Sequence, residues 1–444
     1  MVRFLKNIYL TNRFFIFVGS VCVLFVLGYF FPVFGALAKI LLLALAVCMS
    51  TDVLLLFYPG QAVEASRELP KRLSNGDPNP ITISLQHYYP FEIGLNIIDE
   101  LPFQFQKRDH NFEGSLAPKK RTEISYKLTP TQRGSYSFGA LNIYVSSPLG
   151  LTERRYRFDE EQEVPVYPSF IQMRQFELYA ISDRLQDIGI KKIRRIGHTM
   201  EFDQIREYVR GDDVRSINWK ATARAGDLMV NQYRDERSQQ MYSVIDTGRV
   251  MKMPFEGLQL LDYAINSSLA ISNIALTKQD KAGLITFGDQ GCKIIPAQKK
   301  RTHLYNIQEA LYNVDTDFME SNFNRLLTFM HSKISQRSLI LLYTNFQTIE
   351  SMKRKLPILQ QLASKHLLVS IFFVNTELDD LLQSTPESEE EIYIKTIAEK
   401  FNYEKKGIVK MLNRHGIQTI LTRPQDLSIN TINKYLELKA RGLI

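Results

Sequence analysis

The stretch MYSVIDTG, residues 241–248, is an apolar run that ends in an acidic residue, a hydroxyl residue and a glycine. Similar runs follow along the chain, GLITFG, SLILLYTN, LLVSIFFV and IQTILT, and helical patterns such as Leu258, Leu261 and Ile265 separate them. Continuous apolar strands between amphipathic helices are typical of a parallel sheet with both faces covered. Residues 241–444 are therefore predicted to form a doubly wound α/β domain, with CKIIPAQ as an antiparallel edge strand.

Other segments of this domain carry weaker signals. The polar insert that begins STPESEEE is predicted to form one or two surface helices, and Pro424 is predicted to open a terminal helix. In such a sheet, ligands bind where the loops converge at the carboxyl ends of the strands. Neither GxxxxGK[ST] nor a GxGxxG after a strand occurs, so no nucleotide site is predicted. The residues expected at this edge are Asp246, Thr247, Gly248, Thr316, Asp317, Thr344 and Asn345.

Working back towards the N-terminus, residues 14–31 and 33–58 form two apolar runs, each long enough to cross a bilayer core. A cleaved signal peptide would be shorter, and here a second apolar run follows directly after Pro32. The first basic cluster precedes both runs and places the N-terminus in the cytoplasm; it consists of Arg3, Lys6 and Arg13. Residues 1–60 are expected to be an N-terminal tail and a transmembrane helical hairpin, with the later domains cytoplasmic.

Composition excludes several classes of function for the remaining chain. The 444 residues suffice for two or three domains, and the net charge of +8 is scattered along the chain instead of forming one basic stripe. The three cysteines form no disulfide framework, which suits a reducing compartment. The seven histidines have no HExxH or His-plus-Cys spacing. Neither a nucleic-acid partner nor a zinc site is predicted.

Between about residues 61 and 170 the pattern changes to an alternation of apolar and polar residues, as in ITISL and FEIGLNI. Such alternation indicates half-buried strands. Turn signals separate the strands, in SNGDPNP, TPTQRGS and SSPLG. The segment 61–170 is expected to be a small immunoglobulin-like β-sandwich that acts as a scaffold or interaction domain, because no cluster of His, Cys or acidic residues suggests chemistry.

The linking segment, residues 171–240, contains a charged block, REYVRGDDVRSINWKATARAGDLMVNQYRDER, at 206–237. Its acidic and basic residues alternate, so they can form bidentate pairs, while Ile217 and Trp219 alternate as in a strand and supply apolar anchorage. Three interpretations stay open: a structural charge network, an exposed partner-binding surface, and a catalytic carboxylate pair. The residues of interest are Arg206, Glu207, Tyr208, Gly211, Asp212, Asp213, Arg215, Trp219 and Arg224.

The order of these parts resembles a known family. Two membrane spans, a β-rich region with LTPTQRGSYSFGALNIYVSSPLGL, the block EFDQIREYVRGDDVRSINWKATARAGDLMVNQY and then VIDTG are similar to the domain of unknown function family 58. That family comprises bacterial membrane proteins with a von Willebrand factor A-like domain, which implies this fold and a bacterial inner membrane location. Members are typically associated with MoxR-type AAA+ ATPases, which implies an adaptor or co-chaperone role.

The resemblance also implies a metal-ion-dependent adhesion site, which uses DxSxS after the first strand, a later threonine and an aspartate after the fourth strand. Asp246 matches the first position, but Gly248 and Val250 stand where serines belong. Asn345 replaces the second aspartate, and Thr316 matches the threonine. A hard cation prefers charged oxygen ligands, so we expect a degenerate, metal-free site and no cofactor, with Mg²⁺ as the alternative.

Two functions from different classes follow. The first is a non-catalytic, membrane-anchored interaction protein that serves a MoxR-type AAA+ ATPase. The second is a metal-dependent enzyme, a hydrolase, or an Mg²⁺-dependent ligand-binding module that uses the carboxyl edge of the sheet. The missing oxygen ligands and the absence of a nucleophile beside a base favour the first.

Overall fold

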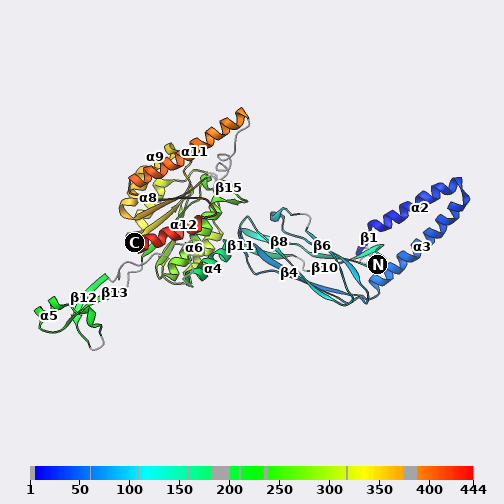
Figure 1. Ribbon diagram of the computed structural model, residues 1–444, viewed down its shortest axis with the longest axis horizontal. Coiled ribbons are helices and arrows are strands. Elements are labelled where there is room, and N and C mark those ends of the chain that lie inside the picture. The colour runs from blue at the N-terminus through cyan, green and yellow to red at the C-terminus, as the bar shows by residue number, and fades with distance from the viewer. Residues whose placement is uncertain are drawn as a thin grey trace. The chain divides into compact units, whose positions relative to one another are not determined.

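The computed structural model describes residues 6–60, 62–107, 110–158, 161–181, 201–209, 212–234, 239–316, 319–374 and 388–443 (Figure 1). These residues form two compact units, which divide between Tyr167 and Pro168. Each unit is described by itself.

Unit 1 begins with two long apolar helices, α2 (Asn12–Phe30) and α3 (Pro32–Phe57). Both are long and apolar enough to cross a membrane. Pro32 occupies the first position of α3, where its missing N–H costs no hydrogen bond. The two helices pack against each other, which agrees with the predicted hairpin.

Thr11, just before α2, and Asp52, near the end of α3, are hydrogen-bonded to one loop, residues 147–152. The Asp52 carboxylate in α3 is fully buried and accepts hydrogen bonds from the Thr152 N–H (2.7 Å), the Leu151 N–H (3.0 Å) and the hydroxyls of Ser147 and Thr152. The Thr11 hydroxyl, just before α2, donates to the carbonyl of Gly150 (2.7 Å) in the same loop. These hydrogen bonds connect both helices to the loop that leads into β10.

The rest of unit 1 is rich in strands, in agreement with the alternating pattern. They pair in the orders β1-β10-β9-β5-β6, β2-β4-β7 and β3-β11-β8. A short 3₁₀ turn, η1 (Phe103–Phe105), follows β5. The strands are β1 (Ile8–Leu10), β2 (Val63–Glu68), β3 (Leu73–Ser74), β4 (Asn79–His87), β5 (Ile93–Asp99), β6 (Asn111–Leu116), β7 (Arg121–Leu128), β8 (Gly134–Phe138), β9 (Leu141–Ser146), β10 (Thr152–Phe158) and β11 (Gln162–Tyr167).

Side chains from different sheets share the cores of unit 1. Ile83 and Leu85 of β4 belong to one cluster with Ile97 of β5 and Ile143 of β9, so the β2-β4-β7 sheet and the five-stranded sheet share a core. Burial of these aliphatic side chains contributes about 1.5–3 kcal/mol each.

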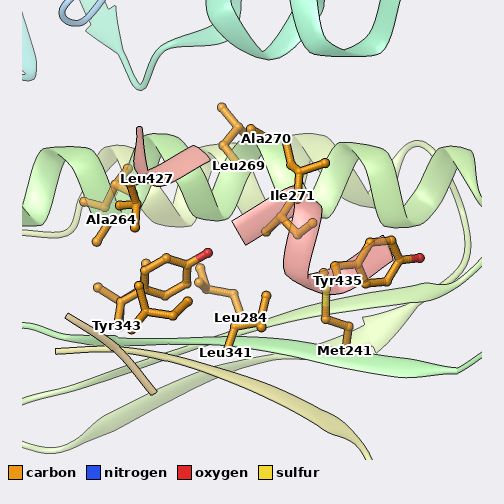
Figure 2. Packing of buried hydrophobic residues seen from close by; sticks show 14 of the residues in the cluster. Met241, Ala264, Leu269, Ala270, Ile271, Leu284, Leu341, Tyr343, Leu427 and Tyr435 are labelled. Atoms are coloured by element: carbon orange, nitrogen blue, oxygen red, sulfur yellow. The ribbon is translucent and has the colours of Figure 1, made fainter. Parts of the chain in front are cut away.

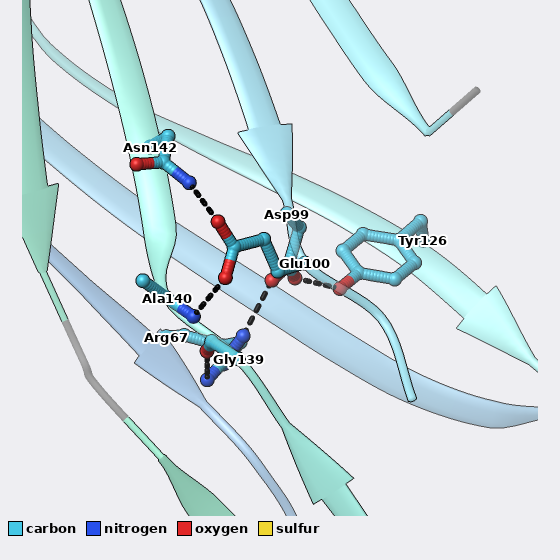
Figure 3. Close-up of polar contacts among 7 residues, drawn as sticks. All are labelled: Arg67, Asp99, Glu100, Tyr126, Gly139, Ala140 and Asn142. Atoms are coloured by element: carbon cyan, nitrogen blue, oxygen red, sulfur yellow. Dashed lines mark hydrogen bonds and ion pairs between the residues drawn. The ribbon is translucent and has the colours of Figure 1, made fainter. Parts of the chain in front are cut away.

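A buried polar network lies between β2, β5 and β7 (Figure 3). The Asp99 carboxylate pairs with the Arg67 guanidinium and accepts a hydrogen bond from the Tyr126 hydroxyl, and both side chains of the ion pair are fully buried. The next residue, Glu100, accepts from the Ala140 N–H (2.9 Å) and the Asn142 amide (2.7 Å). Such pairs are stable in a core because each charge is hydrogen-bonded.

Unit 2 contains a six-stranded sheet in the order β18-β17-β14-β19-β20-β21. All neighbouring strands pair in parallel except β17 and β18. The predicted, mostly parallel sheet with CKIIPAQ as its antiparallel edge strand is therefore present. The strands are β14 (Gln240–Asp246), β17 (Lys281–Phe287), β18 (Cys292–Gln298), β19 (Leu339–Tyr343), β20 (Leu367–Phe373) and β21 (Gln418–Thr422).

Helices cover both faces of this sheet. Neighbouring residues of each strand point to opposite sides, so they pack against different helices. Met241 and Tyr343 pack with α6, α7 and α12 on one face (Figure 2), while Tyr242 and Leu342 pack with α8, α9 and α11 on the other. The helices of unit 2 are α4 (Phe170–Ile181), α5 (Trp219–Ala225), α6 (Leu260–Thr277), α7 (His303–Tyr312), α8 (Phe323–Lys333), α9 (Ile349–Lys365), α11 (Glu389–Arg414) and α12 (Leu427–Ala440).

Smaller elements complete unit 2. A hairpin of β12 (Glu201–Glu207) and β13 (Met229–Arg234) encloses α5 and the 3₁₀ turn η3 (Val214–Ser216). After β14 come the 3₁₀ turn η4 (Arg249–Met251) and the short strands β15 (Pro254–Phe255) and β16 (Leu258–Gln259).

Three local predictions were wrong. Leu258 lies in β16, and α6 begins at Leu260, after a capping box between Gln259 and Asp262. The terminal helix begins at Leu427, because Pro424 lies in the preceding turn and its carbonyl accepts the Leu427 N–H. Trp219 opens helix α5, because the Asn218 side chain caps it by accepting from the Ala221 N–H (3.0 Å).

Candidate functional site

Asp246 ends the first strand of the sheet, β14, and is fully buried. Its Oδ1 accepts hydrogen bonds from the Gly248 N–H (2.9 Å) and the Ser321 hydroxyl, and its Oδ2 accepts from the Thr344 hydroxyl (2.6 Å). A carboxylate has about four lone-pair positions, so protein donors already occupy most of its acceptor capacity. The arrangement is a closed hydroxyl cage around one carboxyl group.

Burial dominates the electrostatics of this cage. Desolvation raises the pKa of Asp246, while the hydrogen bonds from Ser321, Thr344 and Gly248 and the positive charge of Lys355 act in the opposite direction. Lys355, on α9, pairs with Glu320 (3.6 Å) and lies over the Phe323 ring. A cation from the protein thus already acts on the carboxyl group to which a metal would bind.

The position of the Ser321 side chain accounts for the glycine at position 248. A Cβ atom at position 248 would lie 2.2 Å from the Ser321 hydroxyl oxygen, far closer than van der Waals contact. A serine at 248 would therefore collide with the Ser321 side chain. The Ser321 hydroxyl contacts Asp246 instead, from a loop 75 residues further along the chain.

The other described residues predicted for the adhesion-type site make different contacts. Val250 lies in η4 and packs against the hydrophobic core. Thr316 is buried, and its hydroxyl has no hydrogen-bond partner within the described residues. The Asn345 side chain accepts from the Lys405 ammonium (2.6 Å), and Asp317 lies outside the described residues.

The charged block carries one of the predicted ion pairs. The Arg206 guanidinium donates to Asp212 Oδ1 (2.6 Å), and the Val209 N–H donates to its Oδ2 (2.9 Å). The Arg206 hydrogen bond, followed by that of Val209, holds the pKa of Asp212 below its usual range. These contacts join Asp212 to the end of β12 and to Val209.

The remaining members of the block are distributed around this turn. Tyr208 donates its N–H to the Leu228 carbonyl (2.7 Å), and the Glu207 carbonyl accepts from Arg206 (3.1 Å). The Asp213 carbonyl accepts the Ser216 N–H in η3, which also contains Arg215. Arg224 lies in the last turn of α5, and Gly211 lies outside the described residues. The larger network expected of these residues stays a prediction.

Apolar side chains of the same block point to solvent. Trp219 is 69% exposed, Val214 67% and Val209 60%. Exposed large apolar side chains occur at interaction surfaces. Charged residues of both signs neighbour these three residues in the sequence.

Residues 204–406 match the model of the family described as "Protein of unknown function DUF58", so the match begins at the charged block and includes the hydroxyl cage. A region that makes up slightly less than half of the chain is thus similar to the DUF58 family. A relative, the uncharacterized protein YeaD of Bacillus subtilis (strain 168), is 26% identical to this chain over 261 residues, which are 56% of this chain and 62% of the relative. The match therefore spans less than two thirds of the relative's length.

Solved structures that are similar to part of this chain include the following two. The VWA domain of SpRpn10 is 11% identical, with a TM-score of 0.29, and the match covers 44% of this chain and 94% of that domain. The conserved hypothetical protein BatB from Bacteroides thetaiotaomicron is 10% identical, with a TM-score of 0.29, and the match covers 46% of this chain and 100% of that structure.

Proposed function

We propose that this chain is a membrane-anchored interaction protein without catalytic activity of its own, and that it serves a MoxR-type AAA+ ATPase as an adaptor or co-chaperone. Helices α2 and α3 would lie in the bacterial inner membrane, with both units in the cytoplasm. Unit 2 would be a doubly wound von Willebrand factor A-type module, and the strands of unit 1 an immunoglobulin-like sandwich.

The exposure of Trp219 carries this proposal. Tryptophan is enriched among the residues that dominate binding energy in protein interfaces, and an exposed one contributes little to the fold of a monomer. Val209 and Val214 of the same block are exposed as well, and charges of the block would form the polar rim of an interface. The choice of an AAA+ ATPase as the partner rests on the family resemblance.

The closed cage at Asp246 supports the proposal that the chain has no catalytic activity of its own. Asp246, Ser321 and Thr344 are all buried, and the Asp246 carboxyl group is bonded to three protein donors, so neither the hydroxyls nor the carboxyl group is open to a substrate. An Asp246 held in this way positions the loops at the carboxyl edge of the sheet.

The test is recovery of partners from native membranes. Full-length tagged chain is purified, and the co-purifying proteins are identified by mass spectrometry. We expect an AAA+ ATPase with the unaltered chain and its loss with Trp219→Ala, without a change in melting temperature. Phe103→Ala is the matched control, because Phe103 is an exposed aromatic residue of unit 1 (85%) outside the charged block.

Two outcomes would contradict the proposal. One is the absence of an AAA+ ATPase among the proteins that co-purify with the unaltered chain. The other is equal recovery of the ATPase with Trp219→Ala and with Phe103→Ala. The variants Asp212→Ala, Asp213→Ala and Arg215→Ala separate fold from docking, because members of a structural network lower the melting temperature and docking residues lower recovery alone.

A further inference from the structure

A pocket of about 480 Å³ opens at the carboxyl edge of the unit 2 sheet. Its lining includes residues within two positions of the ends of three neighbouring strands, Asn345 after β19, Val374 after β20 and Pro424 after β21. Open α/β sheets bind ligands at this edge, and the volume falls in the range of small-molecule sites.

Most of the lining is apolar. It includes Phe255, Leu260, Phe373 and Phe401. Among the described lining residues, Lys405 carries the one charged side chain. An ammonium group beside four apolar side chains is an unusual component for a pocket with only a packing role, because burial of a charge is costly.

Lys405 extends from α11 and is held in one position. Its Nζ donates to Asn345 Oδ1 (2.6 Å) and to the Phe346 carbonyl (2.6 Å), and it lies 5.8 Å from the centre of the Phe372 ring. An ammonium group has three N–H donors, so one remains for a further acceptor. Burial lowers the pKa of Lys405 to about 8, and at neutral pH the amine is still mostly protonated.

A second feature favours an anion at the same place. Thr348, the N-cap of α9, lines the pocket, and its side chain accepts from the Ser351 N–H (3.2 Å). The positive end of the helix dipole is therefore directed towards the pocket. The Lys405 ammonium and the positive end of α9 both favour a negatively charged ligand.

We propose that this pocket binds a small carboxylic acid whose carboxylate pairs with Lys405 and whose aliphatic or aromatic part contacts Phe255, Leu260, Phe373 and Phe401. The carboxylate would accept the remaining N–H of Lys405. The inference goes beyond the proposed function, since the ligand differs in kind from the protein partner and the residues differ from the charged block.

Equilibrium dialysis with radiolabelled hexanoate tests the proposal. The full-length chain is placed in phosphatidylcholine nanodiscs, and empty nanodiscs measure uptake by the lipid. We expect saturable binding of hexanoate. Hexanamide should bind at least about tenfold more weakly, because the amide lacks the charge that Lys405 recognises. Lys405→Met should lower hexanoate affinity by a similar factor. Lys410→Met, at an exposed position of the same helix, should leave it unchanged.

Three results would overturn the inference. They are the absence of saturable hexanoate binding, equal binding of hexanoate by the Lys405→Met and Lys410→Met variants, and binding of a peptide with a C-terminal leucine in the absence of hexanoate binding. If Lys405→Met does not fold, the comparison of hexanoate with hexanamide on the unaltered chain decides alone. Partner recovery with Trp219→Ala is measured separately, so failure of one proposal is distinguishable from failure of the other.

Discussion

Gly248 and Ser321 compete for one small space beside the Asp246 carboxyl group. Because a Cβ at 248 would meet the Ser321 oxygen, the two positions can be tested as a pair. We expect Gly248→Ser to lower the free energy of unfolding by about 1–3 kcal/mol through overpacking. Ser321→Gly in the same chain should restore most of this loss, as measured by calorimetric melts of the four chains of a double-mutant cycle. Purely additive effects would show that the two side chains do not share the space.

The cage around Asp246 leads to a prediction about Mg²⁺. A cation that bound only the native state at a hundredfold excess over its Kd would add about 2.7 kcal/mol of stability. Since three protein donors bond to the carboxyl group and Lys355 lies nearby, we expect melting curves of the full-length chain in Mg²⁺ and in EDTA to coincide. A higher melting temperature in Mg²⁺ that disappears in Asp246→Ala would establish a metal site.

His366, at the start of β20, is buried, and both ring nitrogens lack a hydrogen-bond partner among the described residues. Burial, with the nearby charges of Lys365 and His331, lowers the pKa of His366 to about 4. The unfolded chain therefore takes up the proton first as the pH falls, so stability is lost between pH 6.5 and 4 and is unaffected above that window.

We expect unfolding at pH 5 to be easier by about 1 kcal/mol after allowing for solvent screening. His366→Leu should flatten this pH dependence in calorimetric melts, whereas His331→Gln, at an exposed position, should retain it. An unchanged pH profile in His366→Leu would show that other groups cause the acid sensitivity.

At the scale of elements, Asp52 attaches α3 to the loop that precedes β10. Asp52→Ala would leave the N–H groups of Leu151 and Thr152 without their acceptor, and the loss of several hydrogen bonds to a buried carboxylate costs about 3 kcal/mol. Hydrogen exchange of the peptide spanning Ser147 to Phe158 should then become about a hundredfold faster. Ser50→Ala is the control, because that hydroxyl bonds only within α3, to Ala46. Equal exchange in the two variants would contradict the attachment.

Local sequence patterns predicted most elements. The strands of unit 1 alternate apolar and polar residues, whereas β14, β17, β19, β20 and β21 are continuous apolar runs. Contacts between distant residues leave no such pattern. Ser321 reaches Asp246 from a loop without periodicity, and Asp52 looks like an interruption of an apolar span, although its partners lie about 100 residues away. The helix at Trp219 was missed because its signal is one capping residue, Asn218.

At the scale of the whole molecule, the attachment of Thr11 and Asp52 to one loop requires that both ends of the hairpin emerge on the same side. With Arg3, Lys6 and Arg13 ahead of α2, we expect that side to be the cytoplasm. A fluorescent protein that matures only in the cytoplasm should therefore be active when fused after Ile444. The same protein inserted between Phe31 and Pro32 should be inactive. Activity of a periplasm-only reporter after Ile444 would overturn this topology.

The hydrogen bonds between α3 and the loop before β10 couple the orientation of the helical hairpin to that of the strands in unit 1. A membrane thinner than the apolar length of a helix causes that helix to tilt, at a cost of fractions of a kcal/mol per ångström of mismatch. In a protein with a flexible linker, the tilt would end at the membrane surface. Here the buried Asp52 and the β1–β10 pairing connect the hairpin to the sheet, so a tilt of the helices becomes a rotation of the strands. If α2 and α3 span a bilayer as proposed, its thickness would therefore set the angle of these strands to the membrane.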